Sequence, residues 1–172
     1  MELVELERLS KEQWEELGAN EPGAWGGGPP ETLHWGPKDR HLALREPGGE
    51  ILAVSGTVIA TVSVEDSPTF QVLGIGGVFV SSSDRGRGLM RSIMGALLTR
   101  AREDSGPERG MLFCLPRLAA VYGSHGFAEI ADPVWADQPG GRVEIPMVSM
   151  WIALHGRPGW PSGRVDLQGL PF

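Results

Sequence analysis

A strand, a glycine-rich turn and a helix follow one another over residues 73–102, and this unit limits the folds open to the chain. Residues 73–80 are apolar and β-branched, as is typical of a buried strand. Residues 81–88 are polar and rich in glycine and arginine. The apolar residues that follow recur at helical spacing, so residues 89–103 predict a helix with one buried face. The strand is therefore expected to enter the helix through a tight polar turn.

The turn before this helix has the composition of an anion-binding site. Arg85 and Arg87 alternate there with Gly86 and Gly88. The first N–H groups of a helix have no partner within it, and the helix dipole is positive at that end. Glycine lets the backbone approach a phosphate closely, and arginine adds charge and paired donors. The alternative is an ordinary surface turn with solvated arginines.

Three strands joined by short turns are expected to lead into this unit as an antiparallel meander. Gly56 is expected at a bulge in the middle strand. Glycines at 74, 76 and 77 weaken the last strand, and they indicate a bulge or a close approach to its backbone. The three strands are predicted over residues 40–46, 51–64 and 69–80.

The chain on either side of this region predicts shorter elements. A short apolar strand at 111–115 follows the helix, and a strand–helix–strand crossover makes it a parallel neighbour of the strand before the helix. Ser10 and Gln13 have capping-box spacing at the start of a helix. The remaining expectations are a strand at 2–9, an irregular segment at 20–37, a helix from Pro116, a loop at 131–141, a strand at 143–154 interrupted by Pro146, and an irregular tail at 155–172.

Composition narrows the class of protein. The 172 residues suit one domain over 1–172, and 41% hydrophobic and 22% charged residues are ordinary for a globular chain. A net charge of −7 argues against nucleic acid and mildly favours a cationic small molecule. The single cysteine, Cys114, lies in an apolar run and is expected to be a buried thiol. The four histidines lack metal-ligand spacing, so no metal is expected.

The N-terminus lacks a secretory signal pattern, and the longest apolar run, residues 51–64, is too short and too polar for a membrane span. We therefore expect a cytoplasmic protein with no membrane partner. A homodimer is compatible with the sequence.

Two motifs resemble the GNAT superfamily of N-acetyltransferases. Residues 85–90, Arg-Gly-Arg-Gly-Leu-Met, are similar to its acyl-coenzyme A signature Gln/Arg-x-x-Gly-x-Gly/Ala, with Met90 in place of the small last residue. Tyr122, followed by Gly126 and Phe127, is similar to its Ala-x-x-x-Tyr-x-x-x-Gly-Phe pattern. Tyr122 is the only tyrosine of the chain.

The resemblance implies an α+β fold with a central, mostly antiparallel mixed sheet, a splayed parallel strand pair and flanking helices. It implies acetyl-CoA as co-substrate, direct attack by an amine in a ternary complex, and Tyr122 as the general acid for the departing thiolate. The pantetheine would lie along the strand end and the pyrophosphate in the arginine turn. The coenzyme residues implied are Val78, Phe79, Val80, Arg85, Gly86, Arg87, Gly88, Leu89 and Met90.

The order of further residues is similar to the aminoglycoside 2'-N-acetyltransferases and the enhanced-intracellular-survival acetyltransferases. Gly76 stands where the former carry a glutamate base, and the region where they carry an acidic residue for the acceptor has Arg164 instead, with Asp166 nearby. A small cationic amine is the expected acceptor, with Trp25 and Trp35 either in the acceptor-site wall or covering the core edge. The general base is open among Glu65, Asp66, Asp137 and Glu144, and His125 is a further residue to test.

Three other functions remain open from the sequence. The chain could acetylate a protein lysine or N-terminus instead of a small amine. It could bind acyl-CoA without catalysis, which the missing glutamate allows. It could also be a structural domain that binds no coenzyme.

Overall fold

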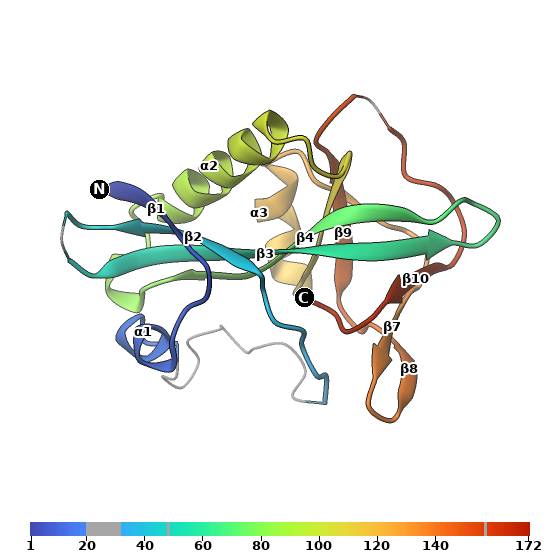
Figure 1. Cartoon of the computed structure of the whole chain (residues 1–172), viewed down its shortest axis with the longest axis horizontal. Coiled ribbons are helices and arrows are strands. Elements are labelled where there is room, and N and C mark those ends of the chain that lie inside the picture. The colour runs from blue at the N-terminus through green and yellow to red at the C-terminus, as the bar shows by residue number, and fades with distance from the viewer. Residues whose placement is uncertain (20–31, 48, 157) are drawn as a thin grey trace.

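One mixed sheet of ten strands forms the centre of the described part of the chain. The computed structural model describes residues 1–19, 32–47, 49–156 and 158–172. Helices α1 (Lys11–Glu16), α2 (Leu89–Glu103) and α3 (Ala119–Gly123) pack on the sheet (Figure 1). The strands are β1 (Glu2–Leu6), β2 (Arg40–Arg45), β3 (Ile51–Val64), β4 (Phe70–Val80), β5 (Arg109–Cys114), β6 (Ala128–Glu129), β7 (Val134–Gln138), β8 (Gly141–Glu144), β9 (Val148–Ala153) and β10 (Val165–Gln168).

The predicted meander and crossover are both confirmed. Strands β2, β3 and β4 pair antiparallel in sequence order, and β1 adds to the free edge of β2. Helix α2 then returns the chain so that β5 pairs parallel to β4, from Val72 with Arg109 to Ile75 with Leu112. The mixed sheet predicted from the sequence, mostly antiparallel with one parallel pair at its centre, is therefore present.

The C-terminal third differs from the sequence prediction. The predicted loop at 131–141 contains β7 and the start of β8, and the chain around Pro146 separates β8 from β9. The predicted irregular tail contains β10, which pairs antiparallel to β3 and parallel to β7. Strand β10 was missed because it is short and its partner is far away in the sequence: it pairs with residues 61–64, about a hundred residues earlier. Strands β7 and β8 form a short hairpin with each other.

The bulge lies on β4, among the glycines that indicated a bulge or a close approach, and not at Gly56 of β3. Val54 pairs with Phe79 and Gly56 pairs with Gly76, so the two residues Gly77 and Val78 face a single residue of β3. Gly77 has a φ of 58°, a conformation that glycine adopts without the penalty of a Cβ. The glycines in β4 therefore mark a bend in that strand, as their spacing indicated.

The two faces of the sheet carry separate apolar clusters. Helices α2 and α3 cover one face through the buried stripe of α2 and through Tyr122, while α1 lies on the other face with Trp14 against Phe79 (Figure 1). The Ser10–Gln13 capping box at the start of α1 is present as predicted. No helix among the described residues is long and apolar enough to cross a membrane. The buried residues of α2 are Leu89, Ile93, Met94, Leu97 and Leu98.

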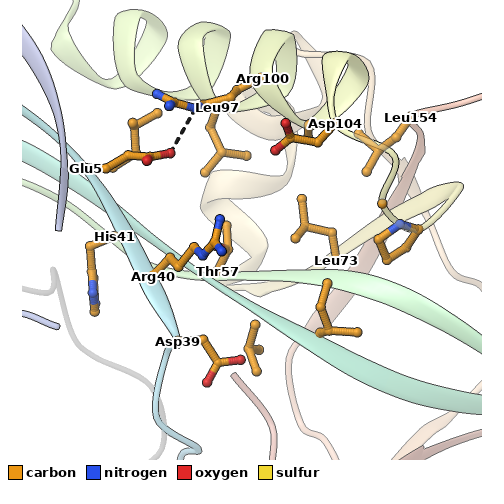
Figure 2. Close-up of a pocket in the computed structure, with 16 residues that line it drawn as sticks. Glu5, Asp39, Arg40, His41, Thr57, Leu73, Leu97, Arg100, Asp104 and Leu154 are labelled. Atoms are coloured by element: carbon orange, nitrogen blue, oxygen red, sulfur yellow. Dashed lines mark ion pairs between the residues drawn. The ribbon is translucent and has the colours of Figure 1, made fainter. Parts of the chain in front are cut away.

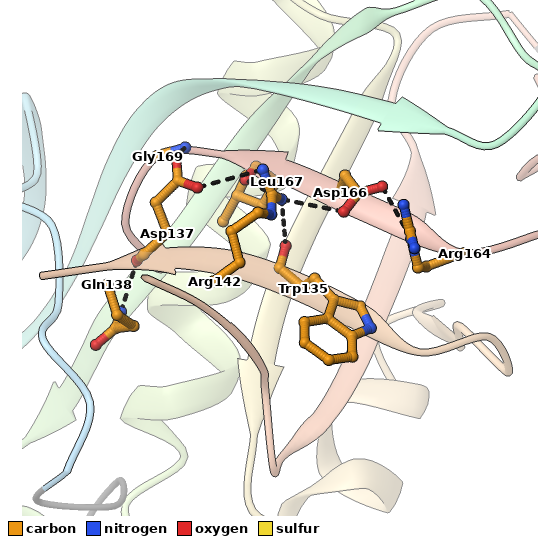
Figure 3. A network of polar contacts seen from close by, with 8 residues as sticks. All are labelled: Trp135, Asp137, Gln138, Arg142, Arg164, Asp166, Leu167 and Gly169. Carbon is orange, nitrogen blue, oxygen red and sulfur yellow. Dashed lines mark hydrogen bonds and ion pairs between the residues drawn. The ribbon is translucent and has the colours of Figure 1, made fainter. Parts of the chain in front are cut away.

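A polar network joins the three strands that the sequence did not predict correctly (Figure 3). The guanidinium of Arg142 in β8 pairs with Asp137 of β7 at 3.2 Å and with Asp166 of β10 at 3.1 Å. The same group donates to the carbonyl of Leu167 at 3.1 Å. Asp137 in turn accepts from the N–H of Gly169 at 2.9 Å. Arg142 thus links the edge strand β8 to its neighbour β7 and to β10, the next strand beyond β7.

We expect Arg142→Ala to lower the free energy of unfolding by about 1 kcal/mol, because a partly exposed ion-pair network with carbonyl contacts is lost. The matched control is Arg164→Ala, which removes one ion pair, to Asp166, from a more exposed side chain. That control should cost about 0.5 kcal/mol or less. Urea denaturation monitored by circular dichroism measures both values. Equal losses would contradict the linking role of Arg142.

Candidate functional site

The central parallel strands separate at a defined pair. The ladder between β4 and β5 ends at Ile75 and Leu112. Beyond it, residues 76–80 of β4 and residues 113–115 line one cavity of about 590 Å³. An extended ligand with amide groups can bind a strand edge that lacks a partner, much as an added strand would.

The turn that follows β4 presents free backbone donors beside this cavity. Gly86 and Gly88 have φ values of 81° and 77°, and both lie in open space. Gly88 is the N-cap of α2, and no side chain caps the first turn of that helix. The N–H groups at this end are therefore available to an anion, and the helix dipole favours negative charge there.

The two arginines of the turn are not equivalent. Arg87 pairs with Asp84, and the hydroxyl of Ser83 also donates to that carboxylate at 2.8 Å. These contacts, the Ser83 hydrogen bond first, lower the pKa of Asp84. Arg85 lines the cavity, whereas Arg87 does not. Arg87 is thus held by a carboxylate of its own turn.

The other predicted coenzyme residues also divide into those whose side chains line the cavity and those whose side chains do not. Val78, Val80 and Met90 line the cavity. Phe79 also borders it, but its side chain is buried in the α1 cluster, so its backbone is the part available to a ligand. Leu89 is 2% exposed and packs in the core. Its N–H group lies in the first turn of α2, where backbone contact with an anion remains available.

Tyr122 borders the same cavity from α3. Its side chain is 7% exposed and meets Phe127 edge-on, with ring centroids 6.1 Å apart. Burial raises the pKa of Tyr122 well above its ordinary value, with a smaller contribution from Cys114. The phenol is therefore neutral over the working pH range and can donate a hydrogen bond. Cys114 is buried as predicted, and burial raises the pKa of its thiol to about 11.

The described lining of the cavity contains no carboxylate side chain. Its charged members are Lys38, Arg85 and Arg117. His125 does not line the cavity, and its pKa is lowered by burial and by the charge of Arg91. The four acidic residues considered as the base also lie outside the described lining: Glu65, Asp66, Asp137 and Glu144. Within the described part of the chain, no three His, Cys, Asp or Glu side chains converge on a metal site.

Two residues that the sequence did not single out, Lys38 and Phe172, fill the space beside Gly74 and Gly76. A Cβ on Gly76 would lie 2.7 Å from Cε of Lys38 and 2.6 Å from the main-chain carbonyl carbon of Phe172. A Cβ on Gly74 would lie 2.8 Å from the ring of Phe172. The glycines of β4 were the available signal, because they predicted a close approach without naming what approaches.

An aromatic wall closes this side of the cavity. Phe172 contacts Phe113 with ring centroids 5.2 Å apart, and Trp35 meets Phe113 at 6.3 Å. Trp35 also packs against the core cluster below it, so it covers the core edge as well as lining the cavity, and its contact with an acceptor stays a prediction. Trp25 lies outside the described residues.

A family model described as an acetyltransferase (GNAT) domain matches residues 7–130, which is more than half of the chain. The chain belongs to the GNAT acetyltransferases. It is therefore an N-acetyltransferase of a family that uses an acyl-CoA co-substrate, as the two sequence motifs implied. No curated protein matches the sequence of this acetyltransferase.

Solved structures share the fold of this GNAT protein at low identity. ElaA from Escherichia coli is 19% identical with a TM-score of 0.56, over 88% of this chain and 98% of that one. An acyl-CoA N-acyltransferase from Pseudomonas aeruginosa is 19% identical with a TM-score of 0.56, over 89% and 100%. Eis1 from Mycobacterium abscessus is 17% identical with a TM-score of 0.56, over 77% of this chain and 33% of that one. The narrower likeness to the aminoglycoside branch stays a prediction.

A second cavity of about 470 Å³ lies on the α2 face, away from the strand separation (Figure 2). Leu73, Leu97 and Leu154 form apolar parts of its wall, and Glu5 pairs with Arg100 at 2.9 Å beside it. None of the residues that resemble the GNAT motifs lines this cavity. The candidate active site of this acetyltransferase is therefore the cavity between β4 and β5.

Gly76→Ala should lower the free energy of unfolding by about 1–3 kcal/mol, because the new methyl group overlaps Lys38 and the Phe172 backbone. Gly95→Ala is the matched control. Gly95 lies within α2 with open space around it, so alanine there should stabilise the protein by up to about 1 kcal/mol. Thermal and urea unfolding measure the loss of stability expected for Gly76→Ala and the gain expected for Gly95→Ala. A Gly76→Ala protein as stable as the parent would rule out the close packing at Gly76.

Proposed function

We propose that this enzyme transfers the acetyl group of acetyl-CoA to the primary amine of a small molecule in the cytoplasm. The observation that carries the proposal is the separation of β4 from β5 at Ile75 and Leu112, with an uncapped helix start at one end of the opening and Tyr122 in its wall. A pantetheine arm has amide groups suited to the exposed strand edge. A pyrophosphate is suited to the helix start.

The backbone of β4 would hold and polarise the donor. The backbone groups of Val78 and Val80 belong to the part of β4 that lies beyond the ladder with β5 and borders the cavity. Backbone donors there would hydrogen-bond the pantetheine and the thioester carbonyl, whose oxygen gains charge when the amine attacks. Arg85 and the N–H groups after Gly88 would bind the pyrophosphate. Holding both reactants in place can supply roughly 7–11 kcal/mol of the barrier reduction.

Tyr122 would stabilise the leaving thiolate. A thiol has an ordinary pKa of about 8.5, whereas burial raises that of Tyr122 above its already higher value. Complete proton transfer from the phenol to the thiolate is therefore unfavourable at equilibrium. A hydrogen bond from Tyr122 to the developing thiolate does not face this difficulty. We thus assign Tyr122 as hydrogen-bond donor to the sulfur, with the final proton coming from the attacking amine.

The lining supports an acceptor with an apolar or aromatic body. Trp35, Phe113 and Phe172 offer ring surfaces, and aromatic faces also attract an ammonium group. Lys38 repels additional positive charge, and the described lining has no carboxylate side chain to offset it. The net negative charge of the whole chain is thus not reflected in the side chains that line this cavity. We propose a small monoamine that reacts as the free amine.

The proposal is tested by incubating the protein with acetyl-CoA and a panel of acceptors while free thiol is measured. The panel contains aromatic and alkyl monoamines, polyamines, and peptides with a lysine. We expect the highest kcat/KM with an aromatic monoamine. Turnover of peptides alone would favour a protein acetyltransferase. Binding of acetyl-CoA in calorimetry without turnover of any acceptor would favour a non-catalytic binding module.

Tyr122→Phe should lower kcat about 100-fold, the range seen when one transition-state hydrogen bond or acid is removed. The dissociation constant for acetyl-CoA should change by less than about threefold, because the phenyl ring keeps the packing against Phe127. Steady-state kinetics and calorimetry separate the two effects. An unchanged kcat would remove Tyr122 from the mechanism.

A further inference from the structure

The side chain of Lys38 lies across β3 and β4, next to the point where β4 separates from β5. Gly56 and Gly76 face each other in the β3–β4 ladder. A Cβ on Gly56 would lie 2.5 Å from Cγ of Lys38, and one on Gly76 would lie 2.7 Å from its Cε. The aliphatic part of Lys38 therefore lies in a furrow that exists because both positions are glycine.

The ε-amine has few partners at this position. Its Nζ donates to the carbonyl oxygen of Gly36 at 2.9 Å. It forms no ion pair with any residue of the described ranges. Burial lowers the pKa of Lys38, so more of it is uncharged at neutral pH than of an ordinary lysine. An uncharged amine is the form that attacks a carbonyl carbon.

The furrow ends where the proposed chemistry would occur. Gly76 is the first residue of β4 after the ladder with β5 ends at Ile75. Lys38, Gly76 and Tyr122 all border the same cavity. If the donor thioester binds along β4 towards Tyr122, as the proposed function requires, its carbonyl carbon and the amine of Lys38 are held in one cavity.

We propose that Lys38 is a self-acetylation site of this enzyme when no acceptor amine is present. The uncharged ε-nitrogen attacks the thioester carbon, a C–N bond forms and the C–S bond breaks. The nitrogen loses one proton and the coenzyme thiolate takes one up, so the products are N-acetyl-lysine and free CoA. The step needs no reactant besides acetyl-CoA, and it rests on the proposed function.

The acetylated protein would be a less active form of the enzyme. An amide does not pass its acetyl group on as a thioester does, so each chain reacts once. Acetylation removes the charge of Lys38 and adds volume beside Gly76, where the packing is already close. The modified enzyme should therefore turn over an acceptor amine more slowly than the unmodified one.

The other lysine of the chain, Lys11, is an internal control for the labelling of Lys38. The sequence has two lysines, Lys38 and Lys11. The side chain of Lys11 is 82% exposed on α1, where its Nζ lies 3.5 Å from Glu15. Direct chemical acetylation favours an exposed amine, whereas a reaction directed by the bound coenzyme favours Lys38.

The experiment incubates the full-length protein with acetyl-CoA without acceptor and follows intact mass and peptide mass over time. We expect one acetyl group per chain, with Lys38 labelled at least about tenfold faster than Lys11. The preference for Lys38 over Lys11 should vanish when the protein is unfolded in urea. With acetyl-N-hydroxysuccinimide, a reagent that needs no binding site, Lys11 should be labelled faster than Lys38. Tyr122→Phe should slow labelling of Lys38 and leave that of Lys11 unchanged. Lys38→Arg should abolish the fast labelling.

Calorimetry with CoA on the same sample separates the two proposals. If CoA binds and Lys38 is labelled no faster than Lys11, self-acetylation is wrong and the proposed function stands. If CoA does not bind, both proposals are wrong. Fast labelling of Lys38 that persists at full rate in Tyr122→Phe would keep the modification and remove Tyr122 from it.

Discussion

The loss of hydrogen bonding between β4 and β5 beyond Ile75 and Leu112 is the constraint on which the site depends. Backbone N–H and C=O groups away from water need partners, and a strand that leaves its neighbour gives up a row of them. The bulge at Gly77 and Val78 bends β4 at this point. The bend, the opening and the free helix start lie within about a dozen residues, so one local distortion produces a strand edge and an anion site together.

The charge inside the cavity differs from that of the chain as a whole. The net charge is −7, yet the charged side chains of the described lining are Lys38, Arg85 and Arg117. Positive charge at the opening suits an anionic coenzyme. Burial acts on the two titrating groups in opposite senses: it raises the pKa of Tyr122 and lowers that of Lys38, since in both cases it disfavours the charged form. The phenol is left as a donor and the amine as a potential nucleophile.

Local patterns predicted the donor half of the site. The meander, the buried stripe of α2, the arginine turn and Tyr122 are each encoded within short windows, where periodicity and glycine placement are informative. Strand β10 was missed because it is short and pairs with distant residues of β3 and β7, and the short hairpin of β7 and β8 was predicted as a loop running into a strand. A bulge was expected at Gly56 of β3 or among the glycines of β4, and the structure has it on β4, because sequence cannot tell which side of a ladder holds the extra residue.

The sequence by itself determined the strand–turn–helix unit, the GNAT resemblance and the need for something to approach the glycines of β4. Only the tertiary structure decided what approaches. Lys38 and Phe172 are far apart in sequence, and they meet at Gly76 because β2 and β10 flank the two ends of β3 on one edge. The structure also separated Arg85, which lines the cavity, from Arg87, which is held by Asp84. Both outcomes depend on long-range packing and charge pairing, whereas sequence patterns report local backbone preference and burial.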